Sequence, residues 1–264
     1  MRILSITLIT LCILLSGCQA NSHSDKPVLP QYKFQQKANI QSEVDGAIER
    51  ALQTDKLFLL VLGAQWCHDS RGLAQEFSTA NMQTVLTERF ETVFVDVGYY
   101  QDLRELTAQF GYPGYFATPS VMVIDPKTKQ HLNMQSMAMW NAADSVPSDE
   151  VLAYFKTVGL ESLPSLAADS NKQAQLKRIQ DFAYSETARL FSGFEQLGPM
   201  VQLAVDGQLE DKTQLRALAD EIYAFRMALQ KDIHRLHKQL NSAIDASTND
   251  SIDLPSYGPF SWES

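Results

Sequence analysis

Residues 57–70 read Leu57-Phe58-Leu59-Leu60-Val61-Leu62-Gly63-Ala64-Gln65-Trp66-Cys67-His68-Asp69-Ser70. The unbroken apolar run over 57–62 predicts a short strand that is buried on both faces. Beyond the polar residues, Leu73, Ala74 and Phe77 recur at helical spacing and predict a helix that begins near Cys67. This stretch therefore predicts a thiol at the junction of a buried strand and a helix.

The sequence around this stretch alternates between helical and strand patterns over about 33–160. Helices are predicted over 40–52, 81–86, 103–110 and 148–155, strands over 93–97 and 119–124, and a further strand near 129–136. This order of elements predicts an α/β layer fold, in which helices cover the faces of a sheet.

Beyond Pro164 the strand patterns stop, and residues 165–245 read as a helical region. Apolar residues at spacings of three and four predict one helix over 176–194 and a longer one over 215–240. The spacing of apolar residues in the longer helix is compatible with a coiled-coil seam, but a helix packed in a small bundle or onto the first domain is favoured. The tail, residues 246–264, is polar apart from a few aromatic residues, and these either pack back or stay loose.

The first residues of the chain have the pattern of an export signal. Arg2 precedes an apolar run from Ile3 to Leu15 that is short for a membrane span. The sequence Leu15-Ser16-Gly17-Cys18 that ends it resembles the lipobox of bacterial lipoproteins. This resemblance implies a signal peptide over 1–17, an acylated Cys18 and, because Gln19 rather than Asp follows, sorting to the outer membrane. The alternatives are an ordinary cleaved signal peptide and a short transmembrane anchor. Residues 18–38 would then form a polar tether.

The composition and the cysteine count narrow the function further. The chain of 264 residues is 45% hydrophobic and carries a formal charge of −9, which predicts a globular protein without nucleic acid as a partner. Of its 3 cysteines, Cys12 would leave with the signal and Cys18 would carry lipid. An exported protein that keeps only Cys67 has no structural disulfide within its own chain.

The motif Trp66-Cys67-x-x-Ser70, together with Thr118-Pro119 at the entry of a later strand, resembles the thioredoxin-like superfamily. The resemblance covers residues 39–160 and implies a mixed central sheet flanked by helices. It also implies that Cys67 is an exposed nucleophile.

In that superfamily the proline that corresponds to Pro119 is cis and shapes the groove in which a substrate chain lies. The segment 112–117 would lie near Cys67 and line this groove. The substrate-binding residues implied in this way are Trp66, Tyr115, Thr118 and Pro119.

Elementary electrostatics favours the same nucleophile. At a helix start, unpaired N–H groups and the helix dipole stabilise the thiolate of Cys67; a protonated His68 would add to this effect, and Asp69 would oppose it. Ser70 can donate a hydrogen bond to the thiolate, but it cannot resolve a mixed disulfide. The usual motif of the superfamily is C-x-x-C, and this sequence lacks its second cysteine. A second departure is Val61, which stands where many thioredoxins have a buried acidic residue. Cys67 therefore depends on an external thiol.

Metal sites are the weaker interpretation of the histidines. Cys67 and His68 could seed a metal site, but the sequence offers no further ligand nearby. His234 and His237 lie three apart on the longer predicted helix, and their neighbours Arg235 and Lys238 favour a solvated face. We therefore expect neither a metal nor a cofactor.

Two functions remain from the sequence. The first is monothiol thiol-disulfide exchange in the cell envelope, by a protein lipid-anchored to the outer membrane and facing the periplasm. Its partners would be exported proteins or small thiols, with an external thiol or redox partner. The second is a non-catalytic adaptor or chaperone-like lipoprotein that binds a partner through its groove or its C-terminal helices.

Overall fold

The computed structural model describes residues 31–160, 170–245 and 252–264, so the expected signal peptide and Cys18 lie outside the described residues. A three-stranded sheet forms the centre of the first domain, with the strand order β2-β1-β3. The central strand β1 (Leu57–Gly63) pairs parallel to β2 (Phe90–Asp96) and antiparallel to β3 (Ser120–Ile124). The sheet is therefore mixed, as expected.

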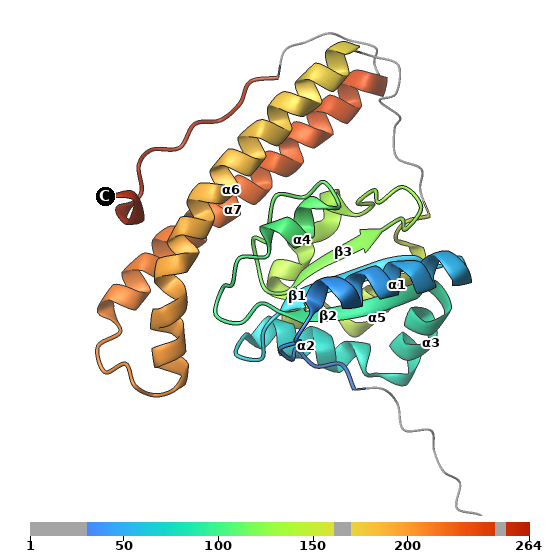
Figure 1. The fold of residues 1–264 in the computed structure, drawn as a ribbon, viewed down its shortest axis with the longest axis horizontal. Helices are drawn as coiled ribbons and strands as arrows, with labels where there is room; N and C mark the ends of the chain where they lie inside the picture. Colours follow the sequence, from blue (N-terminus) through green and yellow to red (C-terminus); the bar gives the residue numbers. More distant parts are fainter. Residues whose placement is uncertain (1–30, 161–169, 246–251) are drawn as a thin grey trace, which may run out of the picture.

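Helices cover both faces of this sheet (Figure 1). They are α1 (Ile40–Thr54), α2 (His68–Phe77), α3 (Ala80–Arg89), α4 (Arg104–Ala108), the 3₁₀ segment η1 (Met134–Ser145) and α5 (Ser148–Thr157). Leu60 on β1 belongs to the core beneath α1, whereas Val61 belongs to the core beneath α2, α3 and α5. Because successive side chains of a strand point to opposite faces, the apolar run of β1 fills both cores.

The fourth strand expected near 129–136 is wrong. His131 makes an isolated bridge to Ile124, and the chain then turns into η1. The backbone N–H of Val123 donates to the side-chain Oδ1 of Asn133 at 2.7 Å, where a strand would have offered a carbonyl. A buried asparagine thus satisfies the free edge of β3.

The C-terminal region is an antiparallel helical hairpin, α6 (Ser170–Val205) and α7 (Thr213–Asp245), packed along one side of the α/β domain (Figure 1). Buried residues of both helices, among them Phe194 and Leu229, belong to the same core as the α1 face of the sheet. The spacing of the longer predicted helix therefore reflects packing against α6 and onto the first domain. No helix in the described ranges is long and apolar enough to cross a membrane.

The aromatic residues of the tail pack back onto the hairpin. The ring of Phe260 lies 4.1 Å from that of Phe225 on α7, and Trp262 donates its indole N–H to the carbonyl of Arg189 on α6 at 2.9 Å. At the other end, Phe34 is 1% exposed and Tyr32 stacks on Phe94, so residues 31–38 are not part of a polar tether. Their aromatic rings cover the sheet face beneath α2 instead.

Candidate functional site

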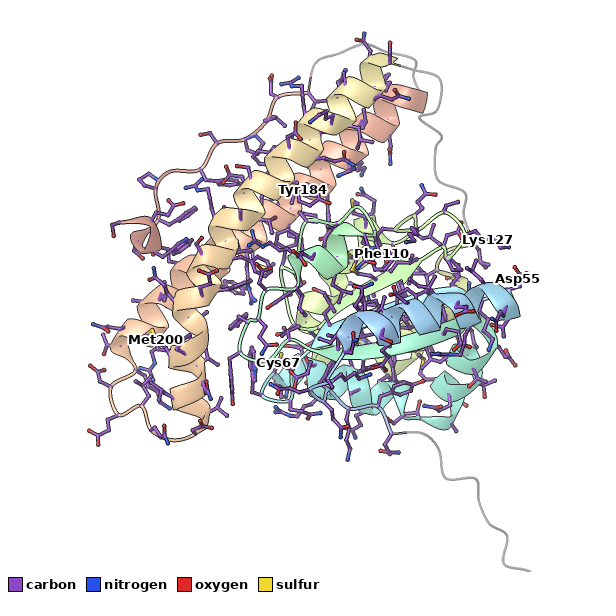
Figure 2. All side chains as sticks on the ribbon, viewed as in Figure 1. Asp55, Cys67, Phe110, Lys127, Tyr184 and Met200 are labelled. Atoms are coloured by element: carbon purple, nitrogen blue, oxygen red, sulfur yellow. The ribbon has the colours of Figure 1, made fainter. Side chains whose placement is uncertain are left out.

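Cys67 lies at the N-cap of α2, directly after the loop that leaves β1. Its side chain makes no capping bond; instead the thiol donates to the backbone carbonyl of Thr118 at 2.9 Å. The residue is half-buried, and Figure 2 shows it at the end of the α/β domain that faces the α6–α7 hairpin. The structure therefore places the thiol at the N-terminal end of a helix, as the sequence predicted.

The Thr118-Pro119 peptide bond is cis. The carbonyl of Thr118, directly before it, faces Cys67 and accepts the thiol at 2.9 Å. Thr118 and Pro119 are both buried. The structure thus brings together the two motifs that the sequence singled out, although they are far apart along the chain.

Trp66 is held in place by the loop that follows β2. Its indole N–H donates to the carbonyl of Gly98 at 2.7 Å, and its ring stacks on Tyr99 and lies 5.2 Å from Tyr100. Tyr100 adopts a left-handed conformation with φ of 63°, which is uncommon outside glycine and asparagine. The sequence predicted only a loop there. The pattern of apolar residues carries no information about a positive φ at a tyrosine, so this conformation could not be predicted from it.

Ser70 and His68 do not reach the sulfur as the sequence suggested. Ser70 is fully buried, and its hydroxyl accepts a hydrogen bond from the backbone N–H of Ala64 at 3.2 Å. This bond supports the loop before Cys67 rather than the thiol itself. The imidazole of His68 is exposed, and its Nε2 lies 3.4 Å from a carboxylate oxygen of Asp144. A protonated His68 would therefore be neutralised in part by Asp144.

The segment 112–117 does not line an open groove. All of its residues are buried, and the ring of Tyr115 packs at 5.2 Å from Phe191 and 5.8 Å from Phe194, both on α6. The hydroxyl of Tyr115 donates to the carbonyl of Gln101 at 2.8 Å, and burial raises its pKa. Tyr115 therefore joins the two parts of the protein, because its apolar ring is more stable under α6 than in water.

The hairpin also reaches the loop beside Trp66. Tyr100 stacks on Phe194 at 4.6 Å, and α6 passes so close that a Cβ on Gly198 would lie 2.3 Å from the carbonyl oxygen of Tyr99. The guanidinium carbon of Arg226, on α7, lies 5.1 Å from the ring centroid of Tyr223. Burial raises the pKa of Tyr100. The charge of Arg226 acts to lower this pKa, and the charge of Cys67 acts to raise it.

Arg226 was not singled out from the sequence. It follows Ile222 by four residues and precedes Leu229 by three, so it lies in phase with the apolar stripe of α7. A charged residue on the apolar face of a predicted helix is the feature of the sequence that could have drawn attention to Arg226.

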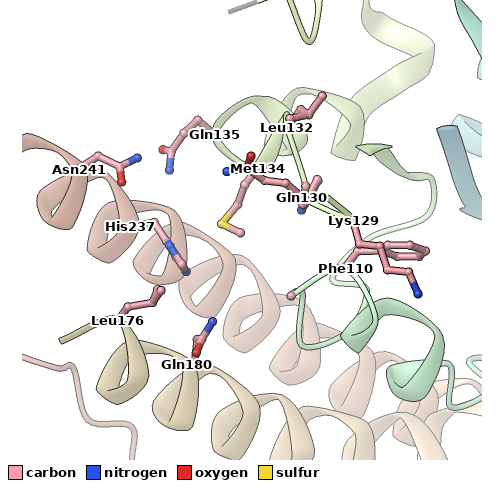
Figure 3. Close-up of a pocket in the computed structure, with 12 residues that line it drawn as sticks. Phe110, Lys129, Gln130, Leu132, Met134, Gln135, Leu176, Gln180, His237 and Asn241 are labelled. Atoms are coloured by element: carbon pink, nitrogen blue, oxygen red, sulfur yellow. The ribbon is translucent and has the colours of Figure 1, made fainter. Parts of the chain in front are cut away.

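A separate pocket of about 290 Å³ lies between the α/β domain and the hairpin (Figure 3). His237 and Gln180 line it from the hairpin, and Gln130, Met134 and Gln135 line it from the loop after β3 and the start of η1. Its polar groups are the amides of Gln130, Gln135, Gln180 and Asn241, the two histidines His131 and His237, and Lys129.

The solvated face expected for His234 and His237 is wrong. His234 is 8% exposed, its Nε2 lies 3.4 Å from the hydroxyl of Tyr112, and burial lowers its pKa from 6.5 to about 4. His237 is half-buried and its pKa is also lowered by burial. The face of α7 that carries them packs on the α/β domain. In the part of the chain that the structure describes, no three histidine, cysteine or acidic side chains are arranged to hold a metal ion.

The comparisons with known proteins agree with this architecture. Residues 39–126 match the sequence profile of a family described as thioredoxin-like. The fold is thioredoxin-like. The matched segment contains β1, Cys67 and the cis proline, whereas the hairpin lies outside it.

A solved structure described as a disulphide isomerase from Xylella fastidiosa Temecula1 is 24% identical, covers 46% of this chain and 92% of that chain, and superposes with a TM-score of 0.43. No curated protein matches the chain.

Proposed function

We propose that this protein carries out monothiol thiol-disulfide exchange through Cys67. The observation that carries the proposal is the position of the thiol at the N-cap of α2, half-buried and against the carbonyl before the cis proline. Its solvent access allows attack on a disulfide, and the helix start stabilises the thiolate that attacks.

The exchange takes two steps. The thiolate of Cys67 attacks one sulfur of a substrate disulfide, forms a mixed disulfide and releases the other half as a thiol. Ser70 cannot resolve the mixed disulfide, because it has no sulfur and its buried hydroxyl is hydrogen-bonded to the backbone N–H of Ala64. An external thiol therefore attacks the mixed disulfide and restores Cys67. The first partner is accordingly a disulfide, either in an exported protein or formed by a small thiol. The second partner is the thiol that resolves the mixed disulfide.

We place this activity in the cell envelope, on a protein that Cys18 anchors to the outer membrane and that faces the periplasm. The support is the signal-like segment and the lipobox resemblance at Leu15-Ser16-Gly17-Cys18. Metabolic labelling with a clickable fatty acid should mark the wild-type protein in the outer-membrane fraction. Labelling that survives Cys18→Ser would contradict the anchor.

The chemistry is tested on the full chain carrying Cys12→Ser and Cys18→Ser, which leaves Cys67 as the sole thiol. Incubation with oxidised glutathione should add one glutathionyl group by intact-mass spectrometry, and a small thiol should remove it. The matched control also carries Cys67→Ser. An unmodified Cys67 after incubation in the folded state would refute the exchange reaction.

A second function, a non-catalytic adaptor, is favoured by the end of the hairpin. Leu203 and Val205 are exposed near the turn between α6 and α7, Tyr223 is exposed on α7, and the hairpin extends beyond the α/β domain (Figure 1). If adaptor binding is the function, Cys67→Ala leaves the cellular phenotype unchanged and replacing these three residues with polar ones abolishes it. The opposite pattern supports exchange.

A further inference from the structure

Helix α6 covers the segment that leads to the cis proline. A Cβ on Gly114 would lie 2.8 Å from side-chain atoms of both Thr187 and Phe191, so α6 packs directly onto this backbone. The ring centroids of Phe191 and Phe194 lie 5.2 and 5.8 Å from that of Tyr115. Because Thr187, Phe191 and Phe194 recur at helical spacing, one face of α6 makes all of these contacts.

The same helix also covers the loop that holds Trp66, the neighbour of Cys67 in the chain. The ring of Tyr100 in this loop stacks on Phe194 at 4.6 Å and lies 5.2 Å from the ring of Trp66. One turn further along α6, a Cβ on Gly198 would lie 2.3 Å from a backbone oxygen of the loop. Two of the segments that surround the thiol are therefore closed by α6.

The exposed residues next to the thiol lie at the start of α2. Gln65 and His68 are exposed, whereas residues 112–120 are all buried. The carbonyl of Thr118 accepts the thiol at 2.9 Å, so a group bonded to the sulfur of Cys67 must lie beside this covered backbone. A small disulfide needs access only to the half-buried sulfur. A cystine within an extended chain has main chain on both sides, and part of that chain would meet α6.

We infer that the face of α6 formed by Thr187, Phe191 and Phe194 restricts Cys67 to the disulfides of small molecules and excludes cystines within a polypeptide. This inference rests on the proposed exchange reaction and specifies its substrate class. The thiolate of Cys67 attacks one sulfur of the small disulfide, the S–S bond breaks, and one half stays on Cys67 as a mixed disulfide while the other leaves as a thiolate. The thiolate of an external small molecule then attacks the mixed disulfide and releases the bound half. No net oxidation or reduction is required.

The test compares two disulfides that share one leaving group, on the full chain with Cys67 as sole thiol. The small one is N-acetylcysteine amide with a pyridylthio group on its sulfur, and the large one is a neutral, unstructured peptide with the same group on a central cysteine. Attack of Cys67 on the cysteine sulfur releases thiopyridone, whose absorbance gives the rate constant. Division by the rate constant of free mercaptoethanol removes the intrinsic reactivity of each disulfide. We expect the wild type to prefer the small disulfide at least about tenfold, because a minor, undocked state of α6 is populated at a tenth or less.

Three variants assign the preference to α6. Phe194→Ala removes the ring that contacts both Tyr115 and Tyr100, so it should raise the rate constant with the peptide at least about tenfold and leave that with the small disulfide nearly unchanged. Thr187→Val, alone or added to Phe194→Ala, should lower the rate constant with the peptide. The Thr187 hydroxyl is buried without a hydrogen-bond partner among the described residues, and a methyl group in its place stabilises the docked helix.

The matched control is Phe155→Ala, which truncates an equally buried ring in the core on the other face of the sheet and should leave the preference unchanged. Equal normalised rate constants of the wild type with the two disulfides overturn the restriction and leave the exchange reaction standing. A rise with the peptide that is as large in Phe155→Ala as in Phe194→Ala also overturns it. If circular dichroism shows that Phe194→Ala does not fold, Thr187→Val alone decides, and an unchanged rate constant with the peptide overturns the restriction. Failure of wild-type Cys67 to react with either disulfide overturns both the restriction and the exchange reaction.

Discussion

Acidification to pH 5 should weaken the contact between the thioredoxin-like domain and the hairpin, because two buried histidines there are neutral. His131 is 5% exposed; its Nε2 lies 2.9 Å from Oδ1 of Asn133, and its Nδ1 is buried without a partner among the described residues. Burial lowers the pKa of His131 from 6.5 to about 3 and that of His234 from 6.5 to about 4. Charge on either would face the other and His237.

The magnitude follows from proton linkage. Between pH 6.5 and the lowered values, the unfolded chain binds protons on these histidines and the folded chain does not, so stability is complete above 6.5 and falls with decreasing pH. One pKa unit corresponds to about 1.4 kcal/mol, so at pH 5 each histidine costs about 2 kcal/mol and the pair about 4 kcal/mol. Carboxylates titrate mainly below pH 5, which leaves this window to the histidines.

The assay is urea unfolding at pH 7.5 and pH 5.0, followed by tryptophan fluorescence, with the two free energies of unfolding compared. His131→Gln keeps a donor for Asn133, and His234→Gln keeps a polar group for Tyr112, but neither glutamine titrates. Each variant should therefore remove about 2 kcal/mol of the pH effect, to which His237 also contributes because burial lowers its pKa as well. Equal stability of the wild type at the two pH values would refute the neutral state, as would an undiminished pH effect in both variants.

Two further predictions concern the packing of the hairpin. Phe194→Ala should lower the free energy of unfolding by about 3–5 kcal/mol, because Phe194 is 1% exposed between the α/β domain and the hairpin. Leu203→Ala is the control and should lower it little, because Leu203 is 40% exposed. Chemical denaturation measures both free energies. Gly198→Ala should destabilise the protein because its Cβ would lie 2.3 Å from the carbonyl oxygen of Tyr99. Gly46→Ala on α1, whose Cβ would meet only the end of the Arg50 side chain at 3.4 Å, should stabilise it by several tenths of a kcal/mol. A thermal shift that ranks the two glycine variants in the opposite order would contradict the close approach of α6.

Part of the site could be predicted from local patterns. The apolar run over 57–62 is long enough for one strand and too short for a helix, and the next apolar residues change to helical spacing, so a strand followed by a helix start at Cys67 was expected. The structure has β1 and α2 at these positions. The fourth strand failed because Asn133, a single side chain, supplies the acceptor that a strand pattern assigns to the backbone.

The environment of the thiol could not be predicted in the same way. Whether Ser70 faces the sulfur or the backbone of Ala64, and whether Tyr115 lines a groove or lies under a helix, depends on which surfaces meet in space. The periodicity of α7 identified an apolar face without identifying its partner. His234 was therefore assigned to solvent by its charged neighbours, although the face that carries it is covered.

The α/β order, the helical C-terminal region and the single thiol at a helix start follow from the amino-acid sequence, because they depend on the spacing of apolar residues and on the residues present. The surroundings of that thiol depend on how distant segments pack in space. The hairpin packs against the face beside Cys67, buries Tyr115 and stacks Phe194 on Tyr100, since burial of its apolar stripe against the sheet core is more favourable than exposure to water. Contacts between residues so far apart in the chain leave no periodic signal in either segment.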